Sequence, residues 1–194
     1  TTTFVLNMTE GFSVEFWLKK DAFDLTKTKK EVILDLWNGE PSSSANYGRF
    51  ILELSGTAEA EAGQDFIRAT IYSGSPGFFS QPIGTSVITT GSLSNWAHYA
   101  FTAVSGDSGI TSRLYKNGVL DENKTLGSSG IGEIGGLING YIGALITSPS
   151  SSNGAATAAK YAGKLNASLD EFRFWKTRRT SEQIHANWIS HVGG

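Results

Sequence analysis

The stretch NASLDEFRFWKTRRTSEQI, residues 166–184, contains a strand pattern followed directly by a helix signal. In a strand, successive side chains point to opposite faces of the sheet. A regular strand would therefore place on one face the side chains of Ser168, Asp170, Phe172 and Phe174. Because two phenylalanines mark that face as buried, we expect Asp170 on the core side of the sheet or at its rim. A carboxylate there needs a cation, a metal ion or several hydrogen-bond donors.

The rest of this stretch predicts one short helix near the C-terminal end. Thr180 is a suitable N-cap, and Gln183 stands at the position that completes a capping box. Ile184 and Trp188 are four residues apart, so they would form an apolar stripe on one side of the helix.

Strand patterns dominate the remainder of the chain. They fall at residues 12–18, 32–37, 49–54, 66–72, 96–103, 113–116 and 140–146. Asn117-Gly118 predicts a type I′ hairpin turn. The segments rich in Gly, Ser, Asn and Pro predict loops at 41–47, 73–84 and 147–159. About ten strands and one helix favour a β-sandwich or jelly roll.

Composition narrows the class of protein and of partner. The chain has 194 residues, which suits a single domain spanning 1–194, and its Thr-Thr-Thr start is compatible with a piece cut from a longer surface protein. A net charge of -2 argues against nucleic acid as the main partner. The absence of cysteine excludes a disulfide scaffold and a thiol catalyst. No apolar run approaches the roughly 20 residues that membrane insertion requires.

Five segments, quoted in chain order, carry a family resemblance. They are FSVEFWL at 12–18, NWAHYAFT at 95–102, RLYKNGV at 113–119, GYIGA at 140–144, and LDEFRFW at 169–175 with the capped helix behind it. Together they resemble the laminin-G-like, concanavalin A-like jelly-roll family. The resemblance implies an all-β jelly-roll sandwich with one short C-terminal helix, on an extracellular, cell-surface or virion-surface protein. It also implies a mostly non-catalytic family that binds sugars, glycosaminoglycans or proteins through rim loops, often with calcium.

The carboxylates do not form the pair that a glycoside hydrolase needs. On a regular strand Glu31 and Asp35 share a face and lie roughly 13 Å apart, whereas a retaining pair needs about 5–5.5 Å and an inverting pair about 6.5–9.5 Å. Glu10 or Glu53 on another strand could come closer, so a glycoside hydrolase remains a less favoured alternative. His98 in its strand is predicted to be structural, and no nucleophile motif or zinc spacing occurs. We therefore expect a protein that is not an enzyme.

Outward-facing aromatic residues are the first candidates for ligand contact. Trp17 and Trp37, the latter beside Asp35, supply flat rings next to carboxylates, as sugar sites do. Phe78 and Phe79 are adjacent in a Gly/Pro-rich loop, and one of them is expected to contact a ligand or another subunit. The predicted ligand-binding residues are Trp17, Asp35, Trp37, Tyr47, Phe78 and Phe79. The alternative is that these rings pack under loops or under the terminal helix.

A calcium ion is the one cofactor that the sequence leaves open. The predicted ligands are Asp170 and Asn139, with Asp107 and Asn153 as further loop contributors. The chain has no contiguous Asp-rich loop, so the alternative is that Asp170 accepts backbone hydrogen bonds and fixes the register of its strand.

These observations lead to two hypotheses about function. The first is a non-catalytic recognition module that binds glycans or glycoconjugates. The second is a structural module of a larger assembly, for example a viral one, that contacts other protein subunits. Exposed loop aromatics at an oligomer interface would favour the second.

Overall fold

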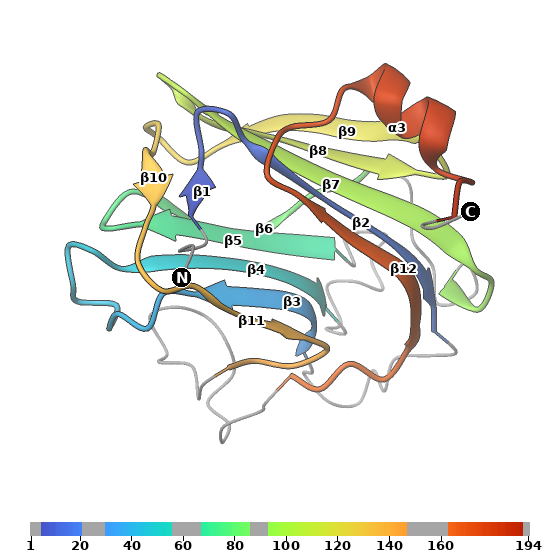
Figure 1. The fold of residues 1–194 in the computed structure, drawn as a ribbon, viewed down its shortest axis with the longest axis horizontal. Helices are drawn as coiled ribbons and strands as arrows, with labels where there is room; N and C mark the ends of the chain where they lie inside the picture. Colours follow the sequence, from blue (N-terminus) through green and yellow to red (C-terminus); the bar gives the residue numbers. More distant parts are fainter. Residues whose placement is uncertain (1–4, 21–29, 56–66, 86–92, 147–162, 192–194) are drawn as a thin grey trace.

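The protein forms two five-stranded antiparallel sheets that face each other (Figure 1). The computed structural model describes residues 5–20, 30–55, 67–85, 93–146 and 163–191. The first sheet has the order β12-β2-β7-β8-β9 and the second the order β11-β3-β4-β5-β6, while β1 and β10 form a two-stranded ribbon. The predicted all-β jelly-roll sandwich with one short C-terminal helix is confirmed.

The elements have the following bounds. The first sheet contains β2 (Phe12–Lys19), β7 (Ala97–Gly106), β8 (Gly109–Lys116), β9 (Val119–Leu126) and β12 (Ser168–Trp175). The second contains β3 (Lys30–Trp37), β4 (Gly48–Ser55), β5 (Ile67–Ser73), β6 (Gly77–Pro82) and β11 (Asn139–Ile142). The ribbon joins β1 (Leu6–Asn7) to β10 (Glu133–Ile134), and the helix is α3 (Ser181–Asn187).

The core lies between the two sheets and is rich in aromatic rings. Phe12 of β2 meets Phe50 of β4 edge-on at 4.6 Å between ring centroids, and Phe50 stacks on Phe101 of β7 at 5.6 Å. These contacts join the two sheets, because each ring stands on the inward face of its own strand. Phe172 and Phe174 of β12 close one side of this core, stacking on Phe16 and Phe12 respectively.

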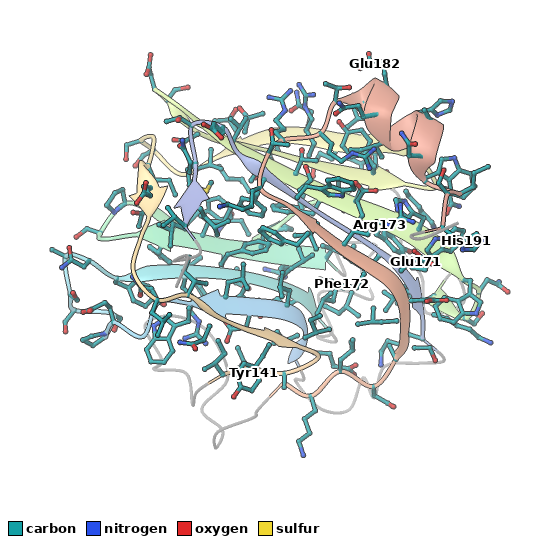
Figure 2. The ribbon with its side chains drawn as sticks, viewed as in Figure 1. Tyr141, Glu171, Phe172, Arg173, Glu182 and His191 are labelled. Carbon is teal, nitrogen blue, oxygen red and sulfur yellow. The ribbon has the colours of Figure 1, made fainter. Side chains whose placement is uncertain are left out.

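A β-bulge in β12 changes which residues face the core. Glu171 has a left-handed φ of 48°, and the pairing with β2 shifts between Asp170 and Arg173. One extra residue reverses the alternation, so Leu169 packs on the core and Asp170 is exposed. In Figure 2, Phe172 points toward the space between the sheets, and Glu171 and Arg173 lie on the other side. The expectation that Asp170 faces the core is therefore wrong.

A second bulge in β3 separates the two carboxylates that a regular strand would align. The pairing with β4 shifts between Val32 and Leu34. Glu31 lies opposite Leu54, a core residue, and its carboxylate binds the buried Lys20 amine at 2.8 Å. Asp35 lies opposite Ile51, which packs on the outer face. Glu31 and Asp35 thus point to opposite faces, and the expectation that they share one is wrong.

The same bulge exchanges two apolar side chains of β3. A regular strand over residues 32–37 would place Val32 in the core with Leu34 and Leu36, and Ile33 on the outer face. Instead Ile33 joins the core, and Val32 packs with Ile51 and Leu145 on the outer face. The reason is again the inserted residue, which reverses the alternation on its N-terminal side.

The segment 73–84, predicted as a loop, contains the strand β6. Its residue Phe78 pairs with Ile71 of β5 and joins the core, with 6% of its surface exposed. Phe79 is half-buried. Only one of the two neighbouring rings is thus buried in the sandwich, and the β5–β6 pairing is irregular directly after it.

The helix α3 packs on the outer face of the first sheet (Figure 1). Thr180 caps it in the predicted capping box with Gln183. Ile184 is fully buried and packs with Ala100 and Tyr115. The helix α3 therefore covers part of the outer face of the first sheet, and the aromatic residue Tyr115 on that face is in contact with it.

Candidate functional site

A polar hollow of about 580 Å³ opens at the rim of the sandwich, between the β3–β4 connection and the segment that contains β10. We call it the rim hollow. It is lined by Asn38, Glu40, Ala45, Asn46, Tyr47, Ser73, Glu133, Ile134, Gly135, Gly136 and Leu137. These residues come from three separate parts of the chain, so the fold alone brings them together.

Asn38 joins two of the hollow's walls. Its amide nitrogen donates to the backbone carbonyls of Asn46 at 2.7 Å and of Gly135 at 3.0 Å. Its amide oxygen accepts from the backbone N–H groups of Glu40 at 3.2 Å and Gly48 at 3.0 Å. These four bonds use both donors and both acceptor positions of the side chain. Asn38 is therefore a positioning residue that fixes the hollow's shape.

Further bonds fix the remaining wall. The Ser73 hydroxyl donates to the Glu133 carbonyl at 3.0 Å, and the Gly74 N–H donates to the Tyr47 carbonyl at 2.6 Å. Gly48 allows the close approach of β4 to β10, since a Cβ there would lie 2.5 Å from Ile134 Cγ2. Side-chain and backbone hydrogen bonds between the walls of the hollow thus fix its shape.

Three side chains in the hollow keep their polar groups available. The carboxylates of Glu40 and Glu133 and the amide of Asn46 form no hydrogen bond or ion pair with the part of the chain that the structure describes. Glu40 is half-buried, and Asn46 and Glu133 are exposed. Together they offer carboxylate acceptors and one amide that can both donate and accept.

Aromatic rings border the hollow on the outer face of the second sheet. Trp37, at the end of β3, is half-buried and donates from Nε1 to the Glu40 carbonyl at 2.8 Å. The rings of Tyr47 and Tyr72 lie 6.0 Å apart. The Tyr47 hydroxyl is buried, and burial raises its pKa although the Arg49 guanidinium opposes the shift. Arg49 lies near this hydroxyl without meeting hydrogen-bond geometry.

The Asp35–Arg49 ion pair packs against the ring of Trp37. Arg49 binds both carboxylate oxygens of Asp35, at 2.9 Å from Nε and 2.6 Å from Nη2, and its guanidinium lies 5.8 Å from the centroid of Trp37. Burial alone would lower the pKa of Arg49, but the Asp35 carboxylate raises it. Asp35 also accepts from the Ile146 N–H at 3.0 Å. Both charges are buried and satisfied, so the pair is structural.

The structure brings together three of the six predicted ligand-binding residues. Tyr47 lines the rim hollow, Trp37 borders it, and Asp35 lies beneath it. The other three lie elsewhere. Trp17 is on the first sheet, 5.8 Å from the rings of Trp188 and His98, Phe78 is in the core, and Phe79 is on β6.

Sequence reasoning missed Asn38, Glu40, Asn46 and Glu133. The Asn38-Gly39 pair directly after a strand was a visible turn signal, and Asn46 lies in a segment already predicted as a loop. Nothing in the sequence indicated Glu133, because contacts with distant parts of the chain, in the β1–β10 ribbon and with Ser73, hold it at the hollow.

The residues predicted to bind calcium lie on different sheets. Asp170 is on β12, and its carboxylate accepts from the N–H of Glu171 at 2.8 Å. Asn139 is on β11, and its amide donates to the Leu137 carbonyl at 3.4 Å. Asp107 lies in the β7–β8 turn, and Asn153 lies outside the described residues. In the described ranges no three His, Cys, Asp or Glu side chains are placed to hold a metal ion. A bound calcium stays a prediction.

Across the five described ranges, no helix has the length and hydropathy required to cross a bilayer.

Solved structures share this fold at low sequence identity. A NanB sialidase mutant from Streptococcus pneumoniae has a TM-score of 0.55 at 16% identity, over 95% of this chain and 26% of the sialidase. The CBM40 of the Ruminococcus gnavus IT-sialidase, bound to α2,3-sialyllactose, has a TM-score of 0.50 at 12% identity, over 93% of this chain and 83% of that one. Domains LG4-5 of the mouse laminin α1 chain also have a TM-score of 0.50 at 12% identity, over 92% of this chain and 40% of the laminin chain.

Sequence comparison places the chain in a family although individual sequences have diverged. No curated protein sequence matches it. The family model for the concanavalin A-like lectin/glucanases superfamily matches residues 1–185. This match covers nearly all of the chain and agrees with the two-sheet architecture described above. The chain belongs to the concanavalin A-like lectin/glucanases superfamily.

Proposed function

We propose that the protein is a non-catalytic glycan-recognition module that binds its ligand in the rim hollow. The observation that carries the proposal is the group of available side chains there: two carboxylates and one amide, held on a rigid frame beside Trp37 and Tyr72. The structurally similar CBM40, solved with sialyllactose, supports a sugar as the class of ligand. The module would act on an outer surface, that of a cell, a secreted protein or a virion.

The chemistry of the hollow suits sugar hydroxyls. A hydroxyl donates well to a carboxylate, and Glu40 and Glu133 can each accept from neighbouring hydroxyls. Asn46 can donate to one hydroxyl and accept from another. Trp37 and Tyr72 are half-buried, and the part of each ring that solvent reaches can pack against the apolar C–H face of a sugar ring. The hollow is open, so we expect weak binding to single sites that gains strength from multivalency.

A glycan array with the isolated protein tests the proposal. We expect saturable binding to a defined group of glycans, followed by titration with the best of them. The substitution Asn46→Ala removes an available amide and should weaken glycan binding about fivefold. The substitution Trp37→Ala should weaken it about tenfold. Trp175→Ala is the matched control, because Trp175 is 39% exposed on the other sheet. Binding to no glycan, or equal losses in all three variants, would contradict the proposal.

A structural role through protein contacts is the second candidate function, and one surface favours it. The edge strand β11 is exposed along its length, and Tyr141 and Ile142 on it are 38% and 56% exposed. Beside it an apolar groove of about 540 Å³ runs between β11 and β12, lined by Leu34, Leu36, Ile138, Gly140, Ile142, Phe172, Phe174 and Lys176. An edge strand next to an apolar groove can pair with a strand of another subunit.

Measurement of the oligomeric state tests this second function. If β11 pairs with a second copy of the chain, light scattering after size exclusion should show a dimer, and Ile142→Glu should convert it to a monomer without loss of folding. A monomer at all concentrations, with glycan binding intact, would leave the recognition module as the function.

A further inference from the structure

The charge of the rim hollow bears on which glycans it can accept. Two of its lining residues, Glu40 and Glu133, are acidic, and none of its lining residues within the described part of the chain is Lys, Arg or His. Neither carboxylate forms an ion pair with any described residue. At neutral pH the hollow therefore has a local negative charge that no side chain in its walls offsets.

Arg49 is a cation beside the hollow, and it is already paired. Arg49 is 3% exposed and binds both oxygens of Asp35. Its guanidinium carbon lies over the Trp37 ring, 5.8 Å from the ring centroid. A guanidinium held in this way cannot turn toward a ligand without leaving Asp35 as an unpaired buried charge, which is costly.

Taken with the proposed function, on which this inference rests, these facts identify the ligand class. We propose that the rim hollow selects uncharged glycans and rejects glycans whose contacting sugar has a carboxylate or sulfate. Hydroxyl groups donate to Glu40 and Glu133, whereas an anionic group there would meet two like charges. Among the described lining residues it would also find no cation to replace the water that it loses.

The size and salt dependence of the effect follow from Coulomb's law. Like charges about 4 Å apart at a solvated surface repel enough to weaken binding by about tenfold or more. The repulsion is screened by salt, with a Debye length of about 10 Å at 0.1 M. Preference for the uncharged glycan should therefore be largest at low ionic strength and should shrink as salt is added.

The experiment uses two glycans that differ in one group, such as a galactose-terminated oligosaccharide and its 6-oxidised uronic acid form, chosen from the family that the array identifies. Dissociation constants are measured for both glycans at about 0.02 M and about 0.5 M salt. The proteins are wild type, the double variant Glu40→Gln with Glu133→Gln, and the control Glu182→Gln. Gln keeps the shape and one acceptor of Glu but removes its charge. Glu182 is on α3, away from the hollow (Figure 2).

We expect wild type and Glu182→Gln to bind the uncharged glycan at least about tenfold more tightly than the acid at low salt, and the double variant to lose most of that ratio. Equal binding of both glycans by wild type, tighter binding of the acid, or a ratio unchanged in the double variant would overturn the inference while leaving glycan recognition intact. Binding of neither glycan, nor of any other on the array, would overturn the proposed function itself.

Discussion

Asp35 is the single residue on which the architecture beside the candidate site depends most. Its carboxylate is fully buried, neutralises Arg49 and accepts the Ile146 N–H. Arg49 in turn packs against Trp37, whose indole fixes the Glu40 carbonyl. The sequence placed Asp35 and Trp37 on one outward face, which is correct. It could not show that Asp35 is a support rather than a ligand contact, because its partner Arg49 comes from another strand.

Replacing Asp35→Ala leaves the Arg49 charge buried without a partner. We expect the free energy of unfolding to fall by about 3–5 kcal/mol, measured by urea denaturation. Replacing both residues, Asp35→Leu with Arg49→Met, should restore much of the loss because no charge is then buried. A single variant that loses less than about 1 kcal/mol would show that the pair is not held as described.

Glu15 gives a prediction about pH. It is buried beside Arg179, with His98 Nε2 at 3.6 Å. Burial alone would raise its pKa, but His98 and Arg179 together lower it below the ordinary value of 4.5. Its ionised form therefore adds stability above the pKa of the unfolded chain, and this is lost as the pH falls through the folded pKa. The stability difference between wild type and Glu15→Gln should shrink below about pH 4.5. A difference constant from about pH 7 to about pH 3 would contradict this.

At the scale of single elements, the sequence predicted where strands form. It was less successful in predicting which residues of those strands are buried. The pattern located β2 and the hairpin at Asn117-Gly118, where Asn117 and Gly118 both have positive φ. It failed in β3 and β12, where one inserted residue reverses the faces. Glu171 takes a left-handed φ, a conformation that Gly or Asn usually signals, so its sequence gave no warning of the bulge.

The bulge in β12 predicts opposite effects for two neighbouring substitutions. Leu169→Ala should lower the free energy of unfolding by about 2 kcal/mol, because Leu169 packs on the core. Asp170→Asn should change it by less than about 0.5 kcal/mol, because Asp170 is exposed. Chemical denaturation of both variants measures this. The reverse ranking would indicate a regular strand with Asp170 facing inward.

At the scale of the whole molecule, the fold could be predicted and the site only in part. The five segments that carry the family resemblance are strands and a capped helix, whose patterns are local. The rim hollow depends on contacts between distant parts of the chain, such as the bond from Asn38 to Gly135, 97 residues apart. Local patterns contain no signal for such contacts, and Glu133 was missed for this reason. Trp37 ends a strand and Tyr47 ends a loop that local patterns predicted, so both could be proposed from the sequence.

The central claim is that a glycan binds in the rim hollow, and mapping by nuclear magnetic resonance tests it most directly. The best glycan from the array is titrated into the isotopically labelled protein, and backbone amide shifts are followed. We predict the largest changes at residues 38–40, 45–47, 73–74 and 133–137, which form or adjoin the hollow. The amides under α3 on β7 and β8 should change little. Saturable binding with its largest changes on the first sheet or at the β11–β12 groove would contradict the claim.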